Sequence, residues 1–232
     1  MVERTLENTK NDRLGIDSVG QHHGQAVKTL RNTYRLLAMT LGFSALVALS
    51  SAALNLPHPG LLLTLVGFFG LLFLTTKTAN SGWGLVSVFA LTGFMGYTLG
   101  PIFNFYLASS HGTSLVSIAA LSTAAVFIGL SAYARSENAL DFTKYGNFLV
   151  VGIIVAFCLG LAAIFMQLPL LSLAVSGVFV LLMSGLIIYE TQNILRGGET
   201  NYILATVTLF VSVYNLFTSL LHILGAFGGD EP

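Results

Sequence analysis

The sequence predicts an all-α integral membrane protein, a bundle of seven transmembrane helices with a cytoplasmic N-terminus and an external C-terminus. Composition, the number of long apolar runs and the placement of basic residues support this fold class. Hydrophobic residues make up 54% of the 232 residues and charged residues only 9%, whereas a soluble domain carries about 25% charged residues. A chain of this length forms one or two ordinary domains, so a larger core cannot explain the excess of hydrophobic over charged residues. Lipid is therefore the expected solvent of most of the chain.

Seven apolar runs are long enough to cross the hydrocarbon core as helices, which takes about 20 residues each. The runs are continuous and lack the alternation of a barrel strand, so helix is predicted throughout. Their connections are short, and several contain proline or glycine, as in NLPHPG, KTANSG and RGGETN. Tight hairpins and a single bundle are therefore expected. The predicted spans are Leu36–Leu54, Gly60–Thr76, Trp83–Tyr106, Thr113–Ala134, Gly146–Met166, Pro169–Glu190 and Tyr202–Phe227.

The segment before the first span, residues 1–33, is polar and mixed in charge, and we expect a flexible cytoplasmic tail. Residues 34–228 form the predicted transmembrane domain, and residues 229–232 a short C-terminal tail.

Basic residues set the predicted orientation, because cytoplasmic loops carry an excess of lysine and arginine. Three lie within the eight residues before the first span, and four lie in the second, fourth and sixth connections, whereas the other three connections have none. An N-terminus in the cytoplasm places all of them on that side. These residues are Lys28, Arg31, Arg35, Lys77, Arg135, Lys144 and Arg196.

The third span contains a glycine face in the stretch GFMGYTLGP. Gly93, Gly96 and Gly100 lie on one side of the helix, and Pro101 removes a backbone hydrogen bond. Small residues let neighbouring helices approach closely in a membrane, so a packing role is predicted. A hinge in a gated pathway is the alternative.

The sixth span ends on a carboxylate, Glu190. An ionisable residue within a membrane span is a functional-site hypothesis by default, and its charged form requires a partner. Lys77 ends the second span on the same side, and polar groups of the last span are further possible partners. Glu190 is thus a candidate gating or proton-sensing residue, unless it reaches headgroup water. The loop acids Asp141 and Glu199 are expected to be solvated.

The last span carries a polar seam with a period of about 3.5 residues, so its members share one side of the helix. A seam of this kind faces protein or a wet cavity. It forms either interhelical hydrogen bonds or the wall of a polar passage. Its members are Thr208, Ser212, Asn215, Ser219 and His222.

The stretches SAYARSENALDFTKYGNFL, GPIFNFY and above all YETQNILRGGETNY with LFVSVYNLFTSLLHILG resemble the Bax inhibitor-1 family, over about Leu30 to Gly225. The resemblance implies a bundle with the last helix at its centre. Some members perform a pH-sensitive calcium leak through a pair of acidic residues. The first acid of that pair aligns with Glu190 and the second with Ser212, so the second carboxylate is missing here.

The stretches TLRNTYRLLAMTLGFSA, PHPGLLLTLVGFFGLLFLTTKTAN and GGETNYILATVTLFVSVYNLF resemble a bacterial branch of the family. This narrower resemblance implies a regulator of the membrane-anchored, ATP- and zinc-dependent protease FtsH. We therefore expect a non-enzymatic protein of the bacterial inner membrane that binds and restrains FtsH and its associated membrane complex. A pH-sensitive leak for calcium, other cations or protons is the alternative.

Other classes of function have little support. No catalytic residues, cofactor or metal site are expected, and the formal net charge of zero does not favour nucleic-acid binding. A serine enzyme using Ser176, in AVSG, with His222 as its base is the enzymatic alternative.

Overall fold

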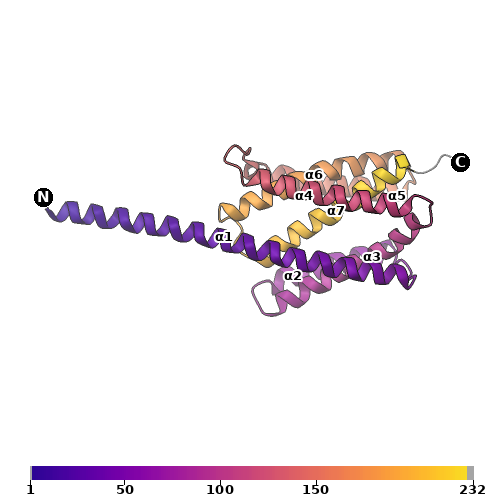
Figure 1. Cartoon of the computed structure of the whole chain (residues 1–232), viewed down its shortest axis with the longest axis horizontal. Coiled ribbons are helices and arrows are strands. Elements are labelled where there is room, and N and C mark those ends of the chain that lie inside the picture. The colour runs from indigo at the N-terminus through magenta and orange to yellow at the C-terminus, as the bar shows by residue number, and fades with distance from the viewer. Residues whose placement is uncertain (1, 229–232) are drawn as a thin grey trace.

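Long α-helices make up most of the computed structural model, which describes the backbone of residues 2–228 and the side chains of residues 24–228. Within those residues there are seven such helices, each with a segment long and apolar enough to cross a membrane. The chain is therefore a multi-pass membrane protein, as predicted. The helices are α1 (Val2–Ala53), α2 (Leu61–Thr78), α3 (Trp83–Leu107), α4 (Gly112–Ala134), α5 (Gly146–Phe165), α6 (Pro169–Leu195) and α7 (Tyr202–Gly228) (Figure 1).

The first helix differs from the expected division at residue 33. α1 is continuous from Val2 to Ala53 and extends beyond the bundle at its N-terminal end (Figure 1). Within the described backbone, residues 2–33 thus form no element separate from the first span. That this segment is a flexible cytoplasmic tail stays a prediction, and residues 229–232 lie outside the described part.

The sixth helix continues past its predicted end at Glu190. It stops at Leu195, where Gly197 adopts a left-handed φ of 77°. The Gly197 and Gly198 amides donate to the carbonyls of Ile194 and Asn193 at 3.1 and 2.9 Å, which closes the final turn. Glu190 consequently lies inside the helix, more than a turn before its end.

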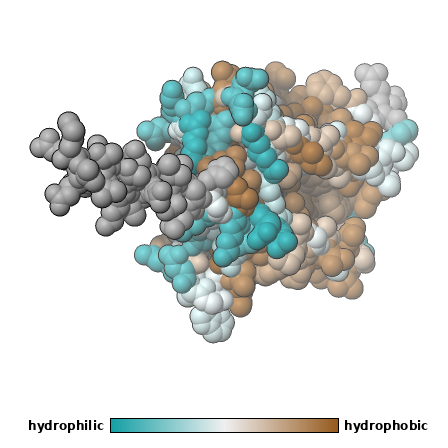
Figure 2. Space-filling model, turned by 60° about the vertical axis from the view of Figure 1, so that its left-hand side comes forward, coloured by the Kyte–Doolittle hydropathy of each residue, from teal (hydrophilic) through white to brown (hydrophobic). Residues whose placement is uncertain are grey.

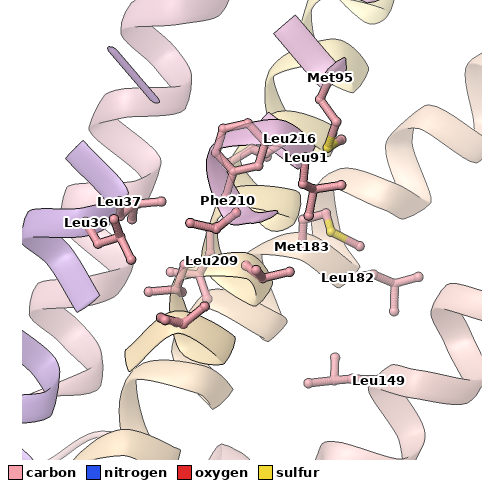
Figure 3. Packing of buried hydrophobic residues seen from close by; sticks show 14 of the residues in the cluster. Leu36, Leu37, Leu91, Met95, Leu149, Leu182, Met183, Leu209, Phe210 and Leu216 are labelled. Atoms are coloured by element: carbon pink, nitrogen blue, oxygen red, sulfur yellow. The ribbon is translucent and has the colours of Figure 1, made fainter. Parts of the chain in front are cut away.

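α7 lies at the centre of the bundle, as the family resemblance implied. It packs directly against α1, α3, α4 and α6, while α2 covers α3 and α5 covers α6. The largest cluster of buried apolar side chains surrounds α7. In Figure 3, Leu209, Phe210 and Leu216 of α7 lie between leucines of α1 and Met183 of α6.

The glycine face of α3 is turned toward α1. A methyl group at Gly96 would overlap the carbonyl oxygen of Ser44, and one at Gly100 would overlap the Ser51 hydroxyl. Gly93 faces the ring of Phe43, and α3 continues past Pro101 to Leu107. The two helix backbones are therefore in close contact along this face, while a hinge here stays a prediction.

Hydrophilic residues gather at the end of the bundle from which the N-terminal part of α1 emerges, and the flanks are apolar (Figure 2). The connections after α2, α4 and α6 lie at this end, which we call the basic end because it carries Lys77, Arg135 and Arg196. Its placement in the cytoplasm rests on the charge rule alone and stays a prediction.

Candidate functional site

Glu190 is a buried carboxylate within α6. Its side chain is 5% exposed. It is hydrogen-bonded by Asn193 one turn later, and the carboxylate of Glu199 lies close enough to repel it. Among the described residues, no lysine or arginine forms an ion pair with it. Glu190 therefore combines burial with an acidic rather than a basic neighbour, an unusual arrangement within a membrane protein.

The expected pairing of Glu190 with Lys77 is not formed. Lys77 is exposed, and its ammonium lies 5.5 Å from the centroid of the Phe73 ring on the same helix. The physical reason is the position of α2, which packs on α3 at the outside of the bundle rather than beside the end of α6.

Ser212 is fully buried in α7, about one turn away from the level of Glu190. The register follows from the hydrogen bond between Ser176 Oγ and His222 Nδ1, 2.8 Å long, which places these two residues side by side. The helices α6 and α7 are antiparallel, so a position further along α6 lies opposite an earlier position of α7. Glu190 lies fourteen residues after Ser176, and Thr208 lies fourteen residues before His222. Glu190 is therefore level with Thr208, and Ser212 is about 6 Å further along the axis.

The polar seam of α7 is buried or half-buried along its length, but most of its hydrogen bonds stay within α7. Thr208 Oγ1 donates to Leu204 O at 3.2 Å, Ser212 Oγ to Thr208 O at 2.8 Å, and Asn215 Nδ2 to Val211 O at 2.8 Å. His222 is the seam residue for which a bond to another helix is found, and Ser219 is buried. The Thr208 and Ser212 hydroxyls thus need neither a neighbouring helix nor water to satisfy their donors, whereas the Asn215 amide group has a second N–H beyond its bond to Val211.

Cross-helix hydrogen bonds come instead from residues that the sequence analysis did not identify. Tyr34 of α1 reaches Thr191 of α6 at 3.1 Å, and Thr98 of α3 reaches Tyr214 of α7 at 2.9 Å. Single Thr and Tyr residues in apolar runs have no periodic pattern, so sequence alone does not indicate their partners.

The segment that follows Glu190 is fastened to the loop between α4 and α5. The side-chain amide of Gln192 accepts a hydrogen bond from the Phe142 amide and donates one to the Leu140 carbonyl, both 2.8 Å. Arg196 Nη1 lies 2.7 Å from Asp141 Oδ1. We call this set, Leu140 to Phe142 with Gln192 and Arg196, the loop clasp.

Asp141 is thus bound rather than freely solvated as expected. Hydrogen bonds from the Thr143 side chain and from Arg196 lower the pKa of its carboxyl to about 2. Glu199 is also engaged, because its Oε1 accepts a hydrogen bond of 2.6 Å from the Asn201 amide.

Asn201 caps the first turn of α7 and ties it to the loop after α2. Its Oδ1 accepts from the Ile203 amide at 2.9 Å, while its Nδ2 donates to Asn80 Oδ1 at 2.8 Å. The N-cap position of Asn201 could be predicted from its residue type, but its link to Asn80 could not.

Ser176 and His222 meet, but their hydrogen bonds do not suit catalysis. Ser176 Oγ also lies 3.1 Å from the Ser172 carbonyl, which can only accept. A hydroxyl has one hydrogen, so a serine that donates to this carbonyl accepts from His222 Nδ1–H. A nucleophilic serine needs the reverse, donation to a basic histidine. Within the described residues no carboxylate contacts His222, and no group of three or more His, Cys, Asp or Glu is placed to hold a metal ion.

Comparison with known proteins extends these observations. A family model described as "Inhibitor of apoptosis-promoting Bax1" matches residues 26–229. A protein of Escherichia coli strain K12 named "Modulator of FtsH protease YccA" is 54% identical over 198 residues, which are 85% of this chain and 90% of that protein. An uncharacterized protein of Pseudomonas aeruginosa is 52% identical over 202 residues, covering 87% of this chain and 90% of its own length. A membrane protein of Vibrio cholerae is 42% identical over 205 residues, covering 88% and 92%.

Proposed function

The chain belongs to the Bax inhibitor-1 family, and from this premise we propose that it is a regulatory inner-membrane protein that binds and restrains the protease FtsH. The observation that carries the proposal is the 54% identity to the protein named as the FtsH modulator. That identity extends over 85% of the chain rather than over one motif. The match therefore includes both the lipid-facing helices and the basic end, the surfaces through which a membrane-anchored partner would be reached.

The chemistry of the described residues fits a non-catalytic role. The hydroxyl of Ser176 lies within hydrogen-bond distance of both the Ser172 carbonyl and His222 Nδ1, so the pair links α6 and α7. The loop clasp and the Asn201 cap hold the connections of the basic end in defined positions. A preformed surface of this kind loses little conformational entropy when a partner binds.

Co-purification from detergent-solubilised bacterial membranes tests the proposal. FtsH is expected to co-purify with the full chain, and the turnover of its membrane substrates is expected to slow when the chain is overproduced. A variant lacking residues 2–23 tests whether this segment is a handle for degradation. We expect it to retain FtsH binding and to be degraded more slowly itself. Unchanged substrate turnover despite correct membrane insertion would contradict the proposed restraint.

A cation or proton leak is the second candidate, favoured by one observation, the burial of Glu190 without a basic partner. The absence of an acid at Ser212 argues against a shared proton between two carboxylates. In proteoliposomes, a leak predicts a pH-dependent flux that falls in Glu190→Gln and persists in Glu137→Gln, which alters an exposed loop acid. A flux no greater than that of empty liposomes would exclude this candidate.

A further inference from the structure

A lateral groove opens between α1 and α4, with α7 as its floor. Two adjoining hollows form it, with volumes of about 520 and 280 Å³, and they share Leu41, Phe127 and Ile128 as lining residues. Figure 1 shows α7 crossing behind the gap between the two helices. We call this feature the α1–α4 groove.

Small side chains on both walls keep the groove open. Ala45 and Ala48 of α1 face Ala120 and Ala124 of α4. An alanine side chain is too short to fill the space between two helices that are not in close contact. Most of the remaining lining is aliphatic or aromatic, so the larger hollow would be filled by apolar material rather than by water.

The end of the groove nearest the basic end is polar and cationic. Arg135 and Tyr34 line it, and the guanidinium lies 4.9 Å from the centroid of the Tyr34 ring. No carboxylate of the described residues forms an ion pair with Arg135, although Glu137 follows it closely in the chain. Arg31 and Arg35 are exposed on α1, and Arg31 lies seven residues before the lining residue Ala38, on the same side of the helix.

Ser131 lies on the wall of the smaller hollow, but its hydroxyl oxygen is buried and does not open into the groove. The residue is 5% exposed, and its Oγ has no hydrogen-bond partner. A buried hydroxyl without a partner costs about 1–3 kcal/mol. Ser131 lies one helical turn, about 6 Å, deeper than Arg135 along α4.

The dimensions fit a membrane lipid. Tyr34 and Ala48 delimit the lining on α1, and the fourteen residues between them correspond to about 21 Å of helix. One leaflet contributes about half of a hydrocarbon core of ~30 Å. The groove is therefore long enough for one acyl chain, with a cation at the level where a lipid phosphate would lie.

We propose that the α1–α4 groove binds an acidic phospholipid, with one acyl chain between Ala45 and Ala124 and its phosphate at Arg135. Arg135, with Arg31 and Arg35 exposed on the same end of α1, selects a lipid of net negative charge over a zwitterionic one. This inference does not depend on the proposed regulation of FtsH.

Electron spin resonance with spin-labelled phospholipids tests the proposal. The full chain is reconstituted in phosphatidylcholine vesicles that contain a trace of spin-labelled phosphatidylglycerol or spin-labelled phosphatidylcholine, and the motionally restricted fraction is measured. We expect the chain to prefer phosphatidylglycerol and Arg135→Gln to reduce this preference about fivefold, the contribution of one cation near a membrane surface. Arg135→Lys is expected to restore it in part.

Two matched controls separate the groove from general surface charge. Lys144→Gln removes a cation at the same end, from a side chain that is 77% exposed and not part of the groove, and should leave the preference unchanged. Ala124→Phe should abolish the preference by filling the groove, whereas Ala90→Phe, on an exposed position of α3, should not.

Equal effects of Arg135→Gln and Lys144→Gln would overturn the proposal, as would a preference that survives Ala124→Phe. A groove that instead receives a helix of a partner protein would show no selectivity for phosphatidylglycerol in the purified chain, which also contradicts it. Circular dichroism of each variant verifies that the helices are retained.

Discussion

Asp141 is held by donors from two different loops. Thr143 Oγ1 donates to its carboxylate at 2.5 Å and the Thr143 amide at 3.2 Å, while Arg196 Nη1 lies 2.7 Å away across the loop clasp. These donors stabilise the ionised form, which explains a pKa near 2 instead of the ordinary value of about 3.9.

The pH dependence of stability follows from the direction of this shift. A carboxyl whose pKa is lower in the folded protein stabilises it above the unfolded value, near pH 4, and this contribution is lost as pH falls through about 2. We expect Asp141→Asn to lower the unfolding temperature at pH 7 and to match the wild type near pH 2. Thermal unfolding of the detergent-solubilised protein between pH 2 and 7 measures this. Glu137→Gln, at an exposed loop acid, should show no such pH-dependent difference.

Buried hydroxyls fall into two classes, which are expected to contribute differently to the free energy of unfolding. Thr98 and Tyr214 bond each other across α3 and α7, whereas Ser212 bonds a carbonyl of its own helix. Only the first class contributes to the association of helices.

A double-mutant cycle distinguishes these classes. Thr98→Val and Tyr214→Phe should show a coupling energy of about 0.6–2 kcal/mol, the range for polar contacts between membrane helices. Thr98 and Ser212 share no hydrogen bond, so the changes in unfolding free energy caused by Thr98→Val and Ser212→Ala should be additive within about 0.5 kcal/mol. Unfolding in mixed micelles of dodecyl sulfate provides the free energies, and coupling of similar size in both cycles would contradict this assignment.

At the scale of whole elements, α1 and α3 form the most extensive helix–helix contact among the described residues. Gly96 and Gly100 leave no room for a methyl group because backbone and Cβ atoms of α1 lie against them. Gly93 is different, because its neighbour is the ring of Phe43, which is 39% exposed and can move outward.

Alanine substitutions should therefore differ along this one face. Gly96→Ala should destabilise the bundle by about 1–3 kcal/mol, the usual effect of overpacking, and Gly93→Ala by less. Gly70→Ala on α2 is the matched control, since nothing lies within 4 Å of the added methyl group. It should be neutral or stabilising, because alanine favours helix over glycine by about 1 kcal/mol. Equal losses of stability in Gly93→Ala and Gly96→Ala would show that α1 and α3 are not packed as described.

At the scale of the whole molecule, seven helices that are each able to cross a membrane predict that the two ends of the chain lie on opposite sides. The helices alone do not decide which side is the cytoplasm. The accumulation of lysine and arginine at the basic end favours the cytoplasm for that end.

Cysteine accessibility tests this orientation. The native cysteine is first removed by Cys158→Ala, and Gln25→Cys or Glu231→Cys is then introduced. A membrane-impermeant thiol reagent added outside the inner membrane should label position 231 and should label position 25 only after the membrane is opened. Labelling of both positions from one side would refute the odd number of crossings.

The sequence by itself determined the solvent and the number of crossings, because both depend on composition and on apolar runs within single segments. The central position of the last helix was implied by the family resemblance. The period of the seam from Thr208 to His222 identified a side of α7 that faces protein, and the structure confirms a central α7. The seam's hydrogen bonds, however, run mostly within α7, because a period shows which side is covered and not which atoms are bonded.

Only the tertiary structure decided the contacts between segments. Lys77 was a reasonable partner for Glu190 by depth, yet α2 lies on the outside of α3 and the pair does not form. The loop clasp and the α1–α4 groove join residues between 50 and 101 positions apart in the chain. Such contacts depend on how neighbouring helices are positioned. They also depend on which side chains are too small to close the space between the helices. No single segment of the sequence encodes either property.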